Sequence, residues 1–262
     1  MLQFFDQHIL NKYKKQLRLD LLEVIYKKNG HIGGSLSSLD IMIALYYCNL
    51  FNFDKDHFVL SAGHLASAYY VVLASKGYFP KEKLLTYSDL GSPLQGHVST
   101  QVPGVEYSSG SLGQGLSFAA GLALGDKKHY TICLTSDGEH QEGQIWEAIS
   151  FANKYKLKNL INVIDHNKTQ IDGSIEETMP LTNLKQKYQN FGWQVFEVNG
   201  HHLDALISAF KKATFQKKPT CIIANTILGK GISFMENKYR YHDVKNMSEI
   251  AYLKAKKELE QL

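Results

Sequence analysis

The sequence has little cysteine and no long apolar run. Its three cysteines, Cys48, Cys133 and Cys221, stand far apart inside apolar stretches, so the pattern is neither a disulfide framework nor a paired-cysteine metal motif. We expect three buried, reduced thiols. No stretch approaches the roughly 18 apolar residues of a membrane-spanning helix, and residues 1–6 lack the pattern of a signal peptide. These absences favour a soluble, cytoplasmic protein.

Arginine is also scarce. Only Arg18 and Arg240 are arginines among 29 basic residues, and the formal net charge is +4. Lysines spread along a chain usually lie on solvated helix faces, and no basic segment is interleaved with aromatic residues. The sequence therefore gives no sign of nucleic-acid or membrane binding. Because arginine is the usual bidentate partner of phosphate, a phosphorylated ligand would be held by lysine, by a partner, or not at all.

The length of 262 residues suffices for one large domain with a complete core. Segments typical of helices and of strands alternate along the chain, with no internal repeat and no low-complexity linker. We therefore predict an α/β fold with an open, mostly parallel sheet and helices on both faces. It is expected to form a single domain over residues 1–262, with a helical tail from about residue 245.

Apolar periodicity and turn residues give the expected limits of the elements. Helices are predicted at 10–28, 37–49, 64–76, 116–124, 203–213 and 248–262, the second opened by Ser37 and Asp40 in the manner of a capping box. Strands are predicted at 58–61, 130–136, 160–165, 193–198 and 220–227. Residues 86–107 are rich in glycine, serine and proline, and we expect a long loop over the functional site there.

Two polar segments follow predicted strands and are about thirty residues apart. They read Ser-Asp-Gly-Glu at 136–139 and Asp-His-Asn-Lys-Thr at 165–169. Parallel strands end at one edge of a sheet, where open α/β folds bind ligands, so Asp137 and Asn167 should meet there. One carboxylate and one amide oxygen suit Mg²⁺ or Ca²⁺ and leave room for phosphate oxygens. Taken alone, both segments are also ordinary turn sequences.

The rest of the chain decides between these interpretations. The spacing resembles the motif of thiamine diphosphate enzymes that begins Gly-Asp-Gly and ends in Asn. Further segments resemble, in order and spacing, the N-terminal half of a transketolase: Gly30 to Ser35, Leu60 to His64, Gly96-His97, Gly110 to Gly115 and Gln141 to Gly143. The resemblance extends from about Lys15 to His242. It implies that Mg²⁺ and thiamine diphosphate are the cofactors.

The resemblance also implies roles for individual residues. The metal ligands would be Asp137, Asn167 and the carbonyl of Thr169. Other residues would contact the cofactor, namely His64, Gly110, Leu112, Gly138 and Asn167. Around the thiazolium and the sugar hydroxyls would stand His31, His97 and His242, since imidazoles exchange protons near neutral pH. Glu142 would face an acidic group of a partner, or else be an ordinary first-turn helix carboxylate.

Some features depart from the family pattern or are left without a role. Ser136 replaces the usual glycine before Asp137, and Ile32 and Val98 replace prolines that often follow the corresponding histidines. His242 lies in a region where family sequences vary. Isolated histidines are most often ordinary structural or surface residues, and we interpret five others so: His129, His140, His166, His201 and His202.

The resemblance covers only the first of the three domains of a full-length transketolase. It implies the diphosphate-binding subunit of a split enzyme that transfers a two-carbon ketol unit between sugar phosphates or related carbonyl compounds. The partner would be a separate C-terminal subunit with the pyrimidine-binding domain and its catalytic glutamate, most simply in an α₂β₂ assembly. The alternatives are the α subunit of a thiamine-dependent 2-oxoacid dehydrogenase and a non-catalytic module that keeps the cofactor fold.

Overall fold

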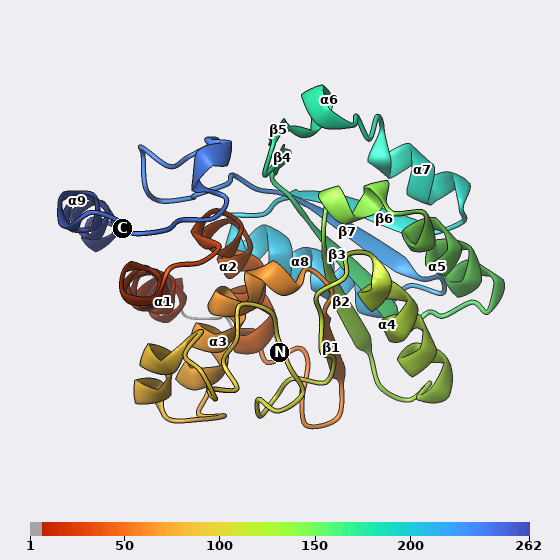
Figure 1. Ribbon diagram of the computed structural model, residues 1–262. Helices are drawn as coiled ribbons and strands as arrows, with labels where there is room; N and C mark the ends of the chain where they lie inside the picture. The colour runs from red at the N-terminus through yellow and green to blue at the C-terminus, as the bar shows by residue number, and fades with distance from the viewer. Residues whose placement is uncertain (1–6) are drawn as a thin grey trace.

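A parallel five-stranded sheet forms the centre of the computed structural model, which describes residues 7–262 (Figure 1). The spatial order is β1 (His57–Leu60), β2 (Thr131–Ser136), β3 (Leu160–His166), β7 (Thr220–Asn225) and β6 (Gln194–Asn199), and every pairing is parallel. The predicted α/β fold with an open, parallel sheet is confirmed. Residues 1–6, where we expect no signal peptide, lie outside the described part of the chain.

Helices cover both faces of the sheet (Figure 1). One face packs against α1 (Gln7–Lys28), α2 (Ile32–Tyr47), α3 (Ala66–Ser75) and α8 (Leu203–Thr214), and α9 (Glu249–Glu260) lies against α1. The other face packs against α4 (Gln114–Gly125), α5 (Gly143–Lys154) and α7 (Leu184–Asn190). The predicted helical tail is confirmed as α9.

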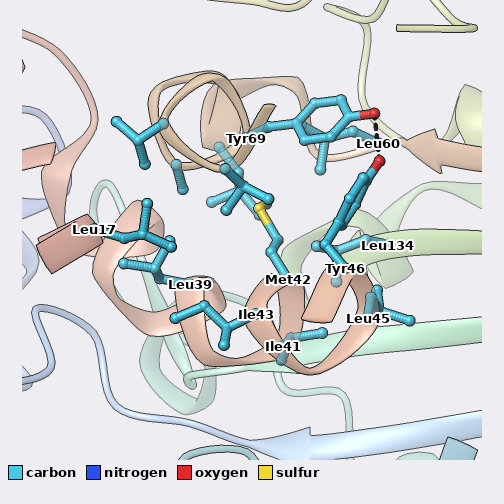
Figure 2. Packing of buried hydrophobic residues seen from close by; sticks show 14 of the residues in the cluster. Leu17, Leu39, Ile41, Met42, Ile43, Leu45, Tyr46, Leu60, Tyr69 and Leu134 are labelled. Atoms are coloured by element: carbon cyan, nitrogen blue, oxygen red, sulfur yellow. Dashed lines mark hydrogen bonds between the residues drawn. The ribbon is translucent and has the colours of Figure 1, made fainter. Parts of the chain in front are cut away.

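Side chains alternate between these two layers, as they must along a strand. In β2, Ile132 and Leu134 point into the layer of α1 to α3, whereas Cys133 points toward α4 and α5. Figure 2 shows the first layer, in which leucines and isoleucines of α2 pack around Met42 and the hydroxyls of Tyr46 and Tyr69 share a 2.8 Å hydrogen bond. All three cysteines are buried and unpaired, as expected.

The start of α2 is the clearest error of the sequence prediction. The helix begins at Ile32, five positions before Ser37, and residues 32–46 are all buried. Ser37 therefore caps nothing, and its hydroxyl donates to Asp165 of β3 instead. Asp40 is no part of a capping box either, because it is buried against Arg18 of α1. Gly33 and Gly34 are residues typical of a loop in the sequence. In the structure they lie in the first turn of the helix, where neighbouring residues leave little room for a Cβ atom.

Several short elements escape the sequence prediction. They are α5, α6 (Ile175–Thr178), α7, the hairpin of β4 (Thr169–Gln170) with β5 (Gly173–Ser174), and four 3₁₀ turns, η1 (Gly63–Leu65), η2 (Lys81–Thr86), η3 (Gly138–Gln141) and η4 (Tyr239–Tyr241). The long loop is confirmed, since residues 87–113 form no helix or strand. Among the helices of residues 7–262, none is long and apolar enough to cross a bilayer.

Candidate active site

Asp137 and Asn167 lie together at the carboxyl edge of the sheet. Their strands are neighbours, with Ser136 of β2 opposite Asp165 of β3. The Asp137 amide donates to the Asp165 carbonyl at 3.2 Å, and the Lys168 amide donates to Asp137 Oδ2 at 2.6 Å. Both side chains are buried, at 2% exposure for Asp137 and 7% for Asn167. The predicted meeting of the two polar segments is therefore present in the structure.

The surroundings of Asp137 disfavour an isolated negative charge. Burial is the main cause that raises the pKa of Asp137 to about 8, and the nearby carboxyl of Asp165 adds to it. The amides of Lys168 and Gly138 act in the opposite direction, each donating to one carboxyl oxygen. Because a carboxylate oxygen has two lone pairs, each oxygen keeps capacity for a cation. A cation bound here would hold Asp137 ionised.

The orientation of Asn167 is fixed by two hydrogen bonds. Its Nδ2 donates to Asp165 Oδ2 and its Oδ1 accepts from the Thr169 amide, both at 2.9 Å. Thr169, two residues after Asn167, is the first residue of the β4–β5 hairpin. Within residues 7–262 no three His, Cys, Asp or Glu side chains are arranged to hold a metal. A cation at Asp137 would thus take most of its ligands from elsewhere, which suits an ion carried by a diphosphate.

Glu139 and Asp165 are central to this edge, although the sequence motifs assign a role to neither. Glu139 is fully buried and accepts hydrogen bonds from Ser61 Oγ at 2.6 Å, the Gly113 amide at 2.8 Å and the Ser136 amide at 2.9 Å. It thereby joins the ends of β1 and β2 to the glycine-rich segment before α4. Asp165 accepts from Ser37, Asn167 and Thr226. Asp165 lies within β3 and Glu139 three residues after β2, and no local motif in the sequence marks either of them.

The glycine-rich segment lies beside this edge. Gly113 has a φ of +81°, and a Cβ there would stand 2.8 Å from Cβ of Glu142, so only glycine fits. A Cβ on Gly110 would meet nothing within 4 Å, whereas one on Gly138 would stand 3.0 Å from Gln170 Nε2. Leu112 is 37% exposed, and its carbonyl accepts from Gln144. Of these three glycines, Gly110 is the one with open space at its backbone.

Glu142 is exposed at the start of α5 and is not a capping residue. It occupies the N-cap position, but its side chain makes no capping hydrogen bond. It lies against Gly113, next to the glycine-rich segment. A carboxylate at a helix start is favoured by the helix dipole. The structure therefore leaves both interpretations of Glu142 in place, with its side chain available to a partner.

Four histidines from four separate segments form one cluster. His31 occupies the N-cap position of α2, His64 lies in η1, His97 in the long loop and His242 directly after η4. The centroid of the His31 ring is 5.8 Å from that of His64, 6.0 Å from that of His97 and 5.6 Å from that of His242. The rings of His64 and His242 are 5.4 Å apart. The structure thus brings together all the histidines expected at the site.

Burial favours the uncharged form of three of these histidines. It is the main cause that lowers the pKa of His64 well below 6.5 and that of His242 to about 4, and the charges of neighbouring histidines lower both further. The pKa of His31 is also lowered by burial, although Asp243 acts in the opposite direction. At neutral pH these three rings are neutral imidazoles, each with one donor and one acceptor nitrogen. They can therefore exchange protons with a bound hydroxyl.

Several polar atoms in this region are shielded from solvent and lack a hydrogen-bond partner within the described chain. They include Nδ1 of His31, Nδ1 of His242, the hydroxyl of Ser109 and the hydroxyl of Tyr87. A Cβ on Gly63 would stand 2.3 Å from the Ser109 hydroxyl oxygen and 3.0 Å from Cδ2 of His97, which places Ser109 beside the cluster. Buried polar atoms without partners are costly, so this set fits a polar ligand.

The five histidines interpreted as ordinary residues make hydrogen bonds within the fold. His140 is buried between the Ser136 carbonyl and Tyr188, and His166 contacts Asn225. His129 pairs with Asp126, and His202 caps α8. His201 bonds Asp40 on one side and the Ile227 amide on the other. None of these five has a ring within the histidine cluster.

Comparison with known proteins shows to which family the chain is similar. Residues 6–260 match the family model described as "Transketolase, thiamine diphosphate binding domain". One of the subunits of the apulose-4-phosphate transketolase of Phocaeicola vulgatus is 41% identical over 238 residues, covering 86% of this chain and 85% of that protein. The 6-deoxy-6-sulfo-D-fructose transketolase subunit SqwG of a Clostridium species is 42% identical over 258 residues, covering 93% and 92%.

Longer transketolases match over part of their length. The human transketolase is 37% identical over 240 residues, which cover 84% of this chain but 38% of that protein. The crystal structure of transketolase from Campylobacter jejuni superposes with a TM-score of 0.92 at 30% identity, covering 98% of this chain and 43% of that one. The chain therefore belongs to the transketolase family, whose thiamine diphosphate-binding domain it contains.

Proposed function

We propose that this chain is the diphosphate-binding half of a two-subunit transketolase that moves a two-carbon ketol unit between sugars. The observation that carries the proposal is that one carboxyl edge of the sheet holds both the Asp137–Asn167 pair and, after β1, His64 of the four-histidine cluster. The Asp137–Asn167 pair suits a cation and a diphosphate. The histidine cluster suits substrates that are rich in hydroxyl groups. The histidine cluster also favours ketol transfer over the 2-oxoacid dehydrogenase alternative and over a non-catalytic module.

The proposed cofactor site uses this chain's residues for binding and orientation. Asp137, Asn167 and the carbonyl of Thr169 would hold Mg²⁺, or Ca²⁺ in its place. Gly138, Gly110 and Leu112 would line the path of the diphosphate, with His64 as a polar contact. When bound, thiamine diphosphate supplies an electron sink that allows a carbon–carbon bond beside a carbonyl to break. Everything that positions its charged end would come from this chain.

The histidines would act on the substrate. His31 and His242 each present a buried nitrogen without a partner, so each can bind a sugar hydroxyl and hold or release its proton. His97 is the exposed member of the cluster and would contact the end of the sugar nearer the solvent. Because burial keeps His31, His64 and His242 neutral, they can both donate and accept hydrogen bonds.

A partner subunit would complete the site. Two relatives of similar length carry names that describe them as subunits of transketolases, which supports a separate partner that contributes the pyrimidine-binding domain. We propose a cytoplasmic α₂β₂ assembly in which Glu142 faces an acidic group of the partner. The exposed position of Glu142 beside the glycine-rich segment supports this arrangement.

The donor and acceptor are proposed to be sugars with an anionic end. One relative is named for a phosphorylated sugar, apulose-4-phosphate, and another for a sulfonated sugar, 6-deoxy-6-sulfo-D-fructose. In this chain Arg18 is buried in an ion pair with Asp40, which leaves Arg240 as the remaining arginine near the site. The anionic end of the substrate would therefore be held mainly by the partner or by lysines.

The test is an activity assay of the chain with and without its partner. The purified chain, supplied with thiamine diphosphate, Mg²⁺ and D-fructose 6-phosphate, should show no ketol transfer to an aldose phosphate. The C-terminal subunit, found by copurification and supplied in equal amount, should restore transfer and tight cofactor binding together. Robust turnover by the chain alone would show that the two-subunit proposal is wrong.

A further inference from the structure

Unpaired polar atoms are concentrated around the histidine cluster. Six side-chain nitrogen or oxygen atoms of the described residues are shielded from solvent and have no hydrogen-bond partner within that part of the chain. Nδ1 of His31 and Nδ1 of His242 belong to the cluster itself, and a third atom, the hydroxyl oxygen of Ser109, lies beside it. Because a buried polar atom without a partner costs free energy, such a gathering indicates groups that are paired when a ligand is bound. The proposed function gives the histidines a ligand but leaves Ser109 without one.

Ser109 lies in the long loop, directly before the glycine-rich segment. Its amide donates to the Val98 carbonyl at 3.0 Å, which holds Ser109 next to the residue that follows His97. A Cβ atom on Gly63 would lie within 3.0 Å of both the Ser109 hydroxyl oxygen and Cδ2 of His97. The two side chains therefore meet at the backbone of Gly63, directly before His64. This contact places the Ser109 hydroxyl against the cluster rather than on the outer surface of the loop.

The neighbouring serine uses its hydroxyl differently. Ser108 is exposed, and its hydroxyl accepts from the Thr100 amide at 3.0 Å and donates to the Thr100 hydroxyl at 3.3 Å. It thus joins two stretches of the long loop on their solvent side. Since these bonds and the backbone bond of Ser109 already connect the two stretches, the Ser109 hydroxyl is not needed for that purpose. Of two adjacent serine hydroxyls, one is bonded within the loop and the other is free for a ligand.

The chemistry of the Ser109 hydroxyl limits what it can bind. A serine hydroxyl donates one hydrogen bond, accepts up to two, and carries no charge. It is therefore suited to hold a neutral hydroxyl group rather than to move a proton or to compensate a diphosphate. The ring beside it is that of His97, which we propose contacts the sugar. A sugar hydroxyl that reaches His97 would thus have the Ser109 hydroxyl as a neighbouring partner.

We propose that Ser109 is a substrate-binding residue whose hydroxyl forms a hydrogen bond with a hydroxyl group of the sugar, next to His97. The inference rests on the proposed function, and it adds to the four histidines a side chain that no sequence motif marks. The bond would form when the sugar binds and would persist through the reaction. Loss of a contact of that kind raises KM and leaves kcat unchanged.

The test compares Ser109→Ala with Ser108→Ala in the assembled enzyme. With D-fructose 6-phosphate as donor, Ser109→Ala should raise KM by about three- to tenfold, which corresponds to the loss of one hydrogen bond of ordinary net strength. The value of kcat and the affinity for thiamine diphosphate should stay the same. Ser108→Ala is the matched control, because it removes the adjacent hydroxyl on the solvent side of the loop, and its KM should equal that of the wild type.

Urea unfolding of the isolated chain provides a readout that needs no turnover. The Ser109 hydroxyl has no partner in the fold, so its removal should leave the unfolding midpoint unchanged or raise it. A midpoint for Ser109→Ala below that of Ser108→Ala would show that the Ser109 hydroxyl supports the fold. That result would overturn the inference whatever reaction the enzyme catalyses.

Kinetics separate the inference from the proposed function. If the wild-type assembly transfers no ketol unit, the proposed function fails and the inference falls with it. If the wild type is active and KM is unchanged in Ser109→Ala, or is raised equally in both serine variants, the inference alone is wrong. Weaker binding of thiamine diphosphate by Ser109→Ala would make the cofactor the ligand of Ser109, and this result would also overturn the assignment to the sugar.

Discussion

At the scale of single residues, Asp137 is the group on which the proposed cofactor site depends most. Its carboxyl is buried, has Asp165 as a neighbour and is favoured in the neutral form, with a pKa of about 8. An unpaired buried charge is costly, so the fold tolerates this carboxylate only with a compensating partner. Asn167 is held in a fixed orientation beside it. These properties support the proposal that the pair receives a positive ion.

Asp137→Ala should abolish thiamine diphosphate binding in the assembled enzyme. Removal of an outer-shell partner of a metal typically costs about 10–100-fold in affinity, and loss of a direct ligand should exceed that. Isothermal titration calorimetry with Mg²⁺ present measures the effect, and thermal unfolding checks that the fold persists. Asp172→Ala is the matched control, because Asp172 is exposed in the turn of the nearby hairpin. Unchanged affinity in Asp137→Ala would remove Asp137 from the metal site.

His97→Ala should lower kcat/KM by about 10²–10³-fold, which is typical of losing one positioned acid–base group or oxyanion donor. The His97 ring is within 6.0 Å of His31, but the residue lies in the long loop and is exposed. Cofactor affinity should thus change little. Steady-state kinetics with the partner present measure the effect, and equal turnover by wild type and variant would make His97 an ordinary loop residue.

At the scale of elements, α2 and the segment between β7 and α9, residues 226–247, depend on each other. We call this segment the C-terminal arm. The helix starts early because Gly33 and Gly34 allow other segments to approach its first turn. A Cβ on Gly33 would stand 2.6 Å from the Tyr241 carbonyl oxygen and 2.9 Å from Leu228 Cδ1. Glycine is poor for helix propensity, so its presence here serves the close packing of the arm. That packing is what brings His242 to His31.

Gly33→Ala should destabilise the chain by about 1–3 kcal/mol, as overpacking commonly does, and should reduce kcat/KM through displacement of His242. Gly121→Ala is its counterpart in α4, where an added Cβ meets nothing within 4 Å. That change should leave stability equal or raise it by up to about 1 kcal/mol, the difference in helix propensity. Denaturant unfolding of the isolated chain measures both. Equal effects of the two substitutions would contradict the proposed packing role of Gly33.

A second group of elements meets at His57, the first residue of β1. Its Nδ1 lies 2.6 Å from Glu106 Oε2, and its Nε2 lies 3.5 Å from Asp126 Oδ2. Partial burial lowers the pKa of His57, but the hydrogen bonds and charges of Glu106 and Asp126 outweigh it and raise the pKa above 6.5. Because the folded state binds the proton more tightly than the unfolded state, this stabilisation is complete below pH 6.5. It is lost as pH rises through the raised pKa.

The free energy of unfolding should therefore fall as pH rises above 6.5, and His57→Gln should reduce this slope. Urea unfolding at half-unit steps from pH 6 to pH 8.5 measures both proteins. The residual slope in His57→Gln reports the other titrating groups. Identical slopes in the two proteins would show that the His57 contacts do not contribute to stability in this range.

At the scale of the whole molecule, a buried ion pair joins α1 and α2. His201 contacts Asp40 of this pair and accepts a hydrogen bond from the Ile227 amide of the arm. Arg18 and Asp40 are both fully buried. Arg18→Ala would leave the Asp40 charge without its main partner, a change that typically costs about 3–5 kcal/mol. Arg240→Ala is the natural control, since Arg240 is exposed and lies over the Tyr241 ring; surface changes of this kind usually stay within about 0.5 kcal/mol. Urea unfolding distinguishes the two, and similar losses would contradict a special role for Arg18.

Sequence alone predicted the parallel sheet, because its buried strands are continuous apolar runs, and it placed Asp137, Asn167 and the glycine–histidine pairs at the site. It could not find Glu139 or Asp165, whose partners Ser61, Gly113, Ser37 and Thr226 are distant in sequence and carry no local signal. It misjudged the start of α2 for a similar reason, since the contacts that favour helix at Gly33 come from the arm. The position of His242 was open until the fold brought its ring to His31.

The docking of the arm onto α2 has a consequence for biosynthesis. Chains emerge from the ribosome N-terminus first, and local regions begin to fold during synthesis. β1, β2 and β3 can form early, but β7 pairs with β3 only later, and the Gly30–Val244 bridge requires the arm that follows. An incomplete chain can therefore possess Asp137 and Asn167 in place while lacking the histidine cluster. The substrate binding proposed for this cluster would thus be acquired only after translation has passed residue 244, so that only chains extended beyond this point could bind substrate.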